Sequence, residues 1–227
     1  GKVLTNVGAD WKPVQNEQAF EFFSEYVYAG DMEMHTAGSL KGGQMIWALA
    51  KVKESLELFK KYIKNLEFKD ATIVGGKYGD AYDPNQRDSK TYYLNNLGEN
   101  YSKAKWYNVI KFITKNILKN YQKDINIIEP LYKEIISIEI LKYNKNGHFK
   151  YHTDHCHKIP RTISISFIIN DDYEGGELEF ENSVTKKKLL IPNTPNTMVV
   201  FPSNFCFRHC VKPIKNGERF SVVIWAL

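Results

Sequence analysis

The second half of the chain alternates between apolar and polar positions with the two-residue period of β-strands. The alternation is clearest from Ile136 to Ile140, where every second residue is isoleucine. Short apolar segments follow at 162–169, 177–180, 188–191, 197–201, 207–211 and 219–227. Turn-forming residues separate them, as in Asn170-Asp171-Asp172, Gly175-Gly176, Pro192-Asn193, Pro202-Ser203 and Asn216-Gly217. Many short strands separated by such turns are typical of a sandwich or a jelly roll.

The first half is predicted to be helical, because its apolar residues recur every three or four positions. One helix is expected at 15–28, before Gly30. A second is expected after the Gly42-Gly43 pair, with an apolar face made of Met45, Leu49, Val52, Leu56, Phe59 and Ile63. A third is expected at 102–120, with an apolar face made of Trp106, Val109, Ile110, Ile113 and Ile117. We expect these faces to pack on a sheet, so that the helices buttress a barrel.

The segment 75–96 is predicted to be a long loop. It is rich in Gly, Asp, Asn and Tyr and contains Asp83-Pro84-Asn85, which is turn chemistry. Long loops in compact domains often have a function, and this one is a candidate lid. Its aromatic residues could stack on a ring of a ligand, or simply pack the loop in order: Tyr78, Tyr82, Tyr92 and Tyr93.

Composition narrows the range of partners and compartments. The net charge is +5, but the lysines are spread along the chain, which favours a solvated surface over a nucleic-acid site. No run reaches the roughly eighteen apolar residues of a membrane span, and 1–5 lacks the apolar core of a secretory signal. The three cysteines, Cys156, Cys206 and Cys210, cannot form a disulfide framework. We therefore expect a reducing compartment and a cytoplasmic protein.

The strongest candidate for chemistry is His152-Thr153-Asp154, followed later by His209. On an extended segment, residues i and i+2 point to the same face, so His152 and Asp154 can bind one ion together. A third ligand from a distant strand completes a set of two histidines and one carboxylate. That set suits non-haem Fe(II), because it leaves coordination positions open.

A carboxylate-binding pair is expected further along the chain. Arg219 opens the last predicted strand, and Ser221 lies on the same face. A guanidinium beside a hydroxyl can hold a carboxylate in fork geometry. Tyr143 supplies another hydroxyl, upstream of His152.

A zinc site is the alternative reading of the histidines and cysteines. His155, Cys156 and His157 are adjacent, and adjacent extended residues point to opposite faces. The sequence also lacks a C-x-x-C pair and an H-E-x-x-H helix. We therefore expect no zinc role for these residues.

The candidate residues lie in a longer pattern. The segment Tyr143-Asn-Lys-Asn-Gly147-His-Phe149-Lys-Tyr151-His152-Thr-Asp154 resembles the Y-x-x-x-G-x-[YF]-x-x-H-x-D signature of prolyl 4-hydroxylase-type 2-oxoglutarate and Fe(II)-dependent dioxygenases. Further matches follow in the family's order: Gly175–Phe180, Phe201-Pro202-Ser203, His209–Ile214, Gly217–Ser221 and Trp225. The resemblance covers 135–227. Phe205–Arg208 is unusual for the family, and its aromatic residues could shape a different pocket.

The resemblance implies a fold and a set of ligands. The fold is a double-stranded β-helix at 135–227, a mainly β, cupin-like jelly roll. The N-terminal part, 1–134, lies outside the resemblance, and its apolar pattern alone predicts a helical elaboration packed on the barrel. His152, Asp154 and His209 would bind Fe(II). Arg219, with Tyr143 and Ser221, would bind 2-oxoglutarate. The remaining expected ligands are dioxygen and, as in the family, ascorbate.

The resemblance also implies a reaction and a substrate. The expected reaction is hydroxylation of a peptidyl proline, coupled to decarboxylation of 2-oxoglutarate to succinate. Residues expected against this substrate are Arg87, which sits in an Arg-x-Ser motif, Tyr151 and Trp225. Two alternatives stay open: the same chemistry on a free amino acid, small metabolite or nucleobase, and a non-catalytic cupin-like binding module. A peptide or protein partner is expected, and nucleic acid or membrane is not.

Overall fold

The computed structural model describes residues 32–40, 45–52, 55–76, 79–95 and 100–227. Side chains are described at 56–73, 81–95 and 100–227. The chain divides into two compact units, Gly1–Tyr62 and Ile63–Leu227. The helix predicted at 15–28 lies outside the described residues.

In the first unit, two strands form an antiparallel hairpin. They are β1 (Met32–Leu40) and β2 (Met45–Val52), which pair along their whole length with one irregularity at Met34/Thr36. The prediction of one helix starting after Gly43 is therefore wrong for 45–52 and confirmed only by α2 (Ser55–Lys64). The reason is that a short, almost continuous apolar run is compatible with either a helix or a strand. Here the pairing with β1 favours the strand.

A six-stranded antiparallel sheet forms one wall of the second unit. Its strand order is β14 (Thr197–Pro202), β10 (Ile163–Ile168), β17 (Arg219–Ala226), β8 (Ile135–Tyr143), β7 (Lys90–Tyr93) and β3 (Lys69–Asp70). The alternating segment at 135 onward is thus confirmed as a strand, and it lies between β17 and β7.

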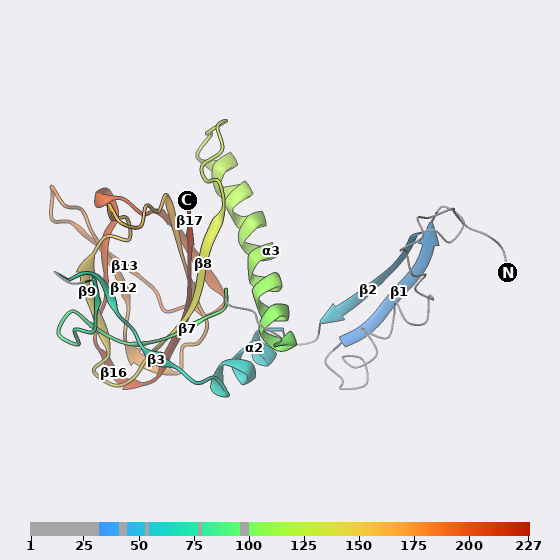
Figure 1. Ribbon diagram of the computed structural model, residues 1–227, viewed down its shortest axis with the longest axis horizontal. Helices are drawn as coiled ribbons and strands as arrows, with labels where there is room; N and C mark the ends of the chain where they lie inside the picture. The colour runs from blue at the N-terminus through green and yellow to red at the C-terminus, as the bar shows by residue number, and fades with distance from the viewer. Residues whose placement is uncertain (1–31, 41–44, 53–54, 77–78, 96–99) are drawn as a thin grey trace. The chain divides into compact units, whose positions relative to one another are not determined.

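A five-stranded antiparallel sheet forms the opposite wall (Figure 1). Its order is β13 (Lys188–Ile191), β12 (Leu178–Glu181), β15 (Arg208–Val211), β9 (His148–His152) and β6 (Arg87–Asp88). Smaller elements complete the unit: β11 (Tyr173–Gly175) with β16 (Ile214–Gly217), β4 (Ile73–Gly76) with β5 (Gly79–Ala81), and a 3-10 turn at Phe205–Phe207. Two facing sheets built this way form a double-stranded β-helix, as predicted.

The helix α3 (Tyr101–Asp124) covers the six-stranded sheet beside β8 (Figure 1). Asn100 caps its start, because the Asn side chain accepts a hydrogen bond from Lys103 N at 2.9 Å. Its buried residues recur every fourth position: Trp106, Ile110, Thr114 and Leu118. The predicted helix is confirmed, but its buried face is rotated, since Val109 and Ile113 are each 37% exposed.

The segment 75–96 is not the single loop that its composition predicts. Among its described residues, the turn at its centre matches the prediction, where Arg87 N donates to Asp83 O at 2.9 Å. Beyond that turn, β6 pairs with β9 and β7 pairs with β8. Alternate residues there are buried (Arg87, Ser89 and Thr91), which is the strand period. Pairing with two long strands therefore overrides the local turn propensity.

Two further expectations concern cysteines and membranes. Cys156, Cys206 and Cys210 are all free thiols, which agrees with the absence of a disulfide framework. Among the helices of the described residues, none is long and apolar enough to cross a membrane.

Candidate functional site

The two candidate histidine ligands face each other across a strand pair. β9 and β15 are neighbours in the five-stranded sheet, and His152 is the register partner of His209. Opposed residues of an antiparallel pair point to the same face, and the two imidazole centroids are 4.4 Å apart. The pairing therefore brings together two residues that are far apart in the sequence.

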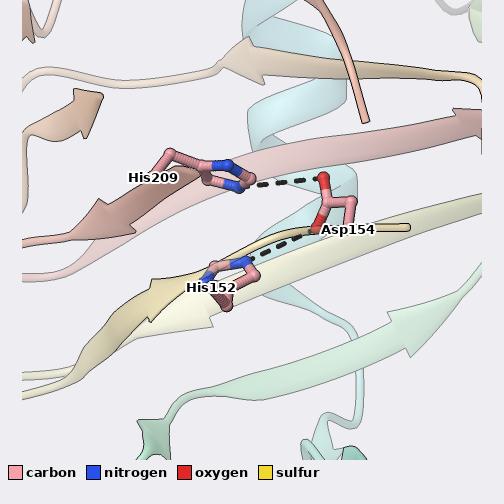
Figure 2. Close-up of side chains that lie close together, drawn as sticks. All are labelled: His152, Asp154 and His209. Carbon is pink, nitrogen blue, oxygen red and sulfur yellow. Dashed lines mark ion pairs between the residues drawn. The ribbon is translucent and has the colours of Figure 1, made fainter. Parts of the chain in front are cut away.

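Asp154 lies just beyond the end of β9, beside the two rings and with one carboxylate oxygen toward each (Figure 2). Its Oδ1 is 3.4 Å from Nε2 of His152, and its Oδ2 is 3.7 Å from Nε2 of His209. One ligand atom from each residue lies within 4.8 Å of the others. The three predicted ligands thus converge on one point.

Backbone carbonyls fix the tautomer of both histidines. Nδ1 of His152 is 2.8 Å from Lys150 O, and Nδ1 of His209 is 2.9 Å from Phe207 O. A carbonyl oxygen only accepts, so each Nδ1 carries the proton. Each Nε2 therefore presents its lone pair toward Asp154, which is how outer hydrogen bonds orient metal-binding imidazoles.

Burial and mutual contact set the charges of this group. Burial disfavours the charge of Asp154, but His209 and His152 next to it hold the pKa of the carboxyl below its usual range. Burial lowers the pKa of His209 to about 4, against the pull of Asp154. At neutral pH the site therefore combines a carboxylate with a neutral imidazole at His209, the forms that bind a metal cation.

The donor set fits Fe(II). Two imidazole nitrogens and one carboxylate form a face with open positions, and the buried Oδ2 of Asp154 has no hydrogen-bond partner. Aromatic rings pack against both imidazoles. The ring of Phe149 stacks on that of His152 with centroids 3.5 Å apart, and the centroid of Phe201 lies 4.8 Å from that of His209. Among the described side chains no other group of three potential ligands converges, so the zinc alternative finds no cluster.

Arg219 lies across the core from the triad, on β17. It is 1% exposed, and its register partner is Tyr143, whose ring centre lies 5.3 Å from the guanidinium carbon. Nη1 donates to Ser221 Oγ at 2.8 Å, while the buried Nε has no partner. No carboxylate of the described residues lies within 4.0 Å of this guanidinium. A buried cation without a counter-ion is costly, and an anionic ligand would supply the missing charge.

Gly176 leaves the space that Arg219 occupies. Its φ is +68°, and an added Cβ would lie 2.2 Å from Cδ1 of Ile214 and 3.1 Å from Cδ of Arg219. Both the backbone conformation and the packing therefore require glycine. The Gly175-Gly176 turn of the sequence pattern thus shapes the arginine pocket.

Two adjoining cavities share His152 and Asp154 of the triad. The inner cavity is narrow and is lined by His152, Asp154, His209, Arg219, Tyr143 and Ser221 among others. The outer cavity has a volume of about 470 Å³ and is lined by His152 and Asp154 together with Arg87, Glu139, Arg161 and Trp225. Its size lies within the range of small-ligand sites. A ligand in either cavity would contact the same metal position.

The predicted substrate residues separate into two groups. Arg87 and Trp225 line both cavities. Tyr151 does not: it donates to Glu179 on the outer face of the sheet and lies 4.8 Å under the guanidinium carbon of Arg208. Successive strand residues point to opposite faces, so an inward His152 forces Tyr151 outward. Tyr151 therefore does not line the two cavities that contain His152 and Asp154, and its contact with a substrate stays a prediction.

Two charged residues of the outer cavity were not predicted. Arg161 stacks on Trp225, with its guanidinium carbon 3.7 Å from a ring centre, and no sequence signal marked it. Glu139 had a signal, because it shares the inward face of β8 with Leu141 and Tyr143. A charged residue at an inward strand position is uncommon unless it is paired or functional.

Comparison with known proteins finds a family model that resembles part of the second half of the chain. The model of the 2OG-Fe(II) oxygenase superfamily matches residues 138–227, and one described as a domain of unknown function (DUF932) matches residues 3–69. A PKHD-type hydroxylase of Prochlorococcus marinus (strain MIT 9301) is 31% identical over 119 residues, or 51% of this chain and 48% of the relative. A PKHD-type hydroxylase of Pseudomonas fluorescens is 27% identical over 93 residues, which are 37% of this chain and 39% of the relative. The chain spans about half the length or less of these curated relatives.

Solved structures show the same fold at low identity. A Pseudomonas putida prolyl-4-hydroxylase superposes with a TM-score of 0.56 and 14% identity, over 76% of this chain and 83% of that one. A prolyl hydroxylase from Trichoplax adhaerens, in complex with a hypoxia inducible factor peptide fragment, superposes with a TM-score of 0.58 and 13% identity. This match covers 93% of this chain and 90% of that one. Residues 138–227, which match the model of the 2OG-Fe(II) oxygenase superfamily, contain the whole His-Asp-His group.

Proposed function

We propose that this protein is an Fe(II)- and 2-oxoglutarate-dependent dioxygenase that hydroxylates a substrate bound in the outer cavity. The observation that carries the proposal is Arg219, a fully buried cation without a carboxylate partner among the described residues, across a narrow cavity from the triad. A dicarboxylate fits this arrangement, because one end can reach the metal position while the other meets the guanidinium. Both fork nitrogens of the arginine would then be used.

The chain's own residues would divide the work as follows. His152, Asp154 and His209 would hold iron, which when bound supplies the activation of dioxygen. Arg219 and Ser221 would bind the distal carboxylate of 2-oxoglutarate, and the hydroxyl of Tyr143 lies on the same inner cavity. The balance is one substrate C–H, one dioxygen and one 2-oxoglutarate converted to C–OH, succinate and carbon dioxide.

Apolar walls would protect the reaction from water. Leu178, Phe201 and Val211 line the inner cavity around the metal position. Excluding water strengthens the electrostatic contacts inside and suppresses side reactions. The same walls leave the outer cavity as the entrance for the substrate.

A prolyl residue of a peptide is the first substrate to test. The curated relatives are named PKHD-type hydroxylases, and the Trichoplax adhaerens neighbour was solved with a peptide. A free amino acid or small metabolite is the alternative, and it suits the volume of the outer cavity. A non-catalytic binding module would need no open metal face.

Succinate formation tests the proposal. The protein mixed with Fe(II), ascorbate and 2-oxoglutarate should release succinate above a metal-free blank, and hydroxylation should appear as a 16-dalton gain in a peptide and metabolite panel. His209→Ala and Arg219→Met should abolish succinate release. Arg208→Met is the matched control, because that guanidinium pairs with Glu181 on the outer face of the sheet. Wild-type rates in His209→Ala would refute the assignment.

A further inference from the structure

The inner faces of β8 and β17 carry different side chains at their two ends. Arg219 pairs with Tyr143 at one end, and Trp225 pairs with Ser137 at the other. Glu139 lies between these ends, opposite Val223. It is four residues from Tyr143, which is about 13 Å along a strand. A carboxylate therefore stands in the outer cavity, well separated from the arginine of the inner cavity.

Glu139 is buried but only partly satisfied. It is 5% exposed; Oε1 accepts from Ser137 Oγ at 3.1 Å and Oε2 accepts from Thr91 Oγ1 at 3.2 Å. A carboxylate can accept about four hydrogen bonds, so half of this capacity is unused. In the described part of the chain, no cationic nitrogen lies within 4.0 Å of it.

The two arginines of the outer cavity are held by other partners. Arg87 donates from Nε to Ser89 Oγ at 2.9 Å and from Nη1 to Thr72 O at 3.2 Å. The guanidinium of Arg161 lies over the ring of Trp225 and its Nη1 donates to Asp154 O at 3.4 Å, while its buried Nε has no partner. Burial raises the pKa of Glu139, and the charges of the two guanidinium groups offset only part of this rise; neither group contacts the carboxylate. The cavity wall thus keeps its positive and negative groups apart.

We propose that Glu139 is a specificity-determining residue that binds a positively charged nitrogen of the substrate. The inference rests on the proposed function, because it takes the outer cavity as the substrate site. A buried carboxylate with unused acceptor capacity gains most from a charged donor. That nitrogen could belong to a basic side chain beside the hydroxylated residue of a peptide, or to the ammonium of a free amino acid.

Matched pairs of compounds test the charge and distinguish its two sources. For the peptide, the pair is acetyl-Gly-Pro-Lys-Gly-amide and the same peptide with norleucine in place of lysine. For the amino acid, the pair is L-proline and N-acetyl-L-proline. Binding is measured by calorimetry on protein loaded with Mn(II) and 2-oxoglutarate, and succinate release is measured in parallel with Fe(II).

In one of the two pairs, the charged member should bind at least about tenfold more tightly, as expected for a charged hydrogen bond. Glu139→Gln should reduce that ratio to near one and leave the affinity for 2-oxoglutarate unchanged. Glu174→Gln, on the exposed surface of β11, should keep the ratio.

Two results would overturn the inference. One is equal binding within both pairs. The other is a charge preference that survives in Glu139→Gln, which would leave Glu139 as a structural anchor of Thr91 and Ser137. Failure of the proposed function looks different, because the parent protein would then release no succinate and bind no 2-oxoglutarate.

Discussion

Replacing Arg219 with methionine should move stability and ligand response in opposite directions. The guanidinium is 1% exposed and has no carboxylate partner among the described residues, and it donates a hydrogen bond to Ser221 Oγ. An unpaired buried charge is destabilising by several kcal/mol, whereas that hydrogen bond contributes about 1.5–3 kcal/mol. Methionine fills a similar length without the charge. The ligand-free variant should therefore unfold at a temperature equal to or above that of the parent.

The response to 2-oxoglutarate should disappear in the same variant. Removing one side of a buried charged contact typically costs about 2–5 kcal/mol, or roughly 30-fold to several-thousand-fold in affinity. At a hundred times its dissociation constant, a ligand stabilises the parent by about 2.7 kcal/mol. For a domain of this size that is a rise in Tm of roughly 5–10 °C.

Thermal unfolding with Mn(II), with and without 2-oxoglutarate, measures both effects. The parent and Arg208→Met should show the rise in Tm, and Arg219→Met should not. Succinic semialdehyde, which lacks the second carboxylate, should give little shift in any of them. An undiminished 2-oxoglutarate shift in Arg219→Met would refute the reasoning and place the carboxylate elsewhere.

Further predictions concern the metal, a buried acid, the substrate wall and a glycine. His209→Ala should lose stoichiometric Mn(II) binding by electron paramagnetic resonance, while retaining the circular dichroism of the parent. Burial raises the pKa of Glu139, so the contribution of this residue to stability is lost as the pH rises from the usual glutamate range through the raised pKa. The Tm of Glu139→Gln relative to that of the parent should therefore increase over this pH window. A difference in Tm that does not change with pH would contradict the shift. Arg87→Ala should spare 2-oxoglutarate binding and uncoupled succinate release but reduce coupled hydroxylation several-fold; equal coupled turnover would limit Arg87 to a structural role. Gly176→Ala should lower the free energy of unfolding by about 1–3 kcal/mol, the cost typical of an overpacked site, which denaturant unfolding measures. An unchanged free energy of unfolding would show that Ile214 and Arg219 can move aside.

The barrel could be predicted because its determinants are local. Alternation and turn residues mark most strands from Ile135 onward, although β11 and β16 were not predicted. The spacing of His152 and Asp154 is enough to place both on one site. His209 needed the family pattern, since no local rule says which distant strand pairs with β9. The register that sets His209 opposite His152 is a property of the sheet as a whole.

The failed predictions share a non-local cause. Arg87–Tyr93 has the composition of a turn, yet it forms β6 and β7 because β9 and β8 offer unpaired edges. The apolar residues at 45–52 also suit a helix, and the pairing with β1 decides for a strand. For Tyr151 a local rule is enough: successive strand residues point to opposite faces, so its place in the motif beside His152 does not put it in the same cavity.

The opposition of His152 and His209 restricts how this protein can change during evolution. Within β9 and β15, an insertion or deletion of one residue would turn a ligand to the outer face of the sheet, whereas a change of two would keep its direction. Length variation is therefore excluded from the ladder between these strands. It is confined to the connections on the barrel rim, such as the turn between β12 and β13, where Val184 is 88% exposed. Lineages that diverge in substrate should differ in those rim connections, and the strands that carry the ligands should keep their lengths.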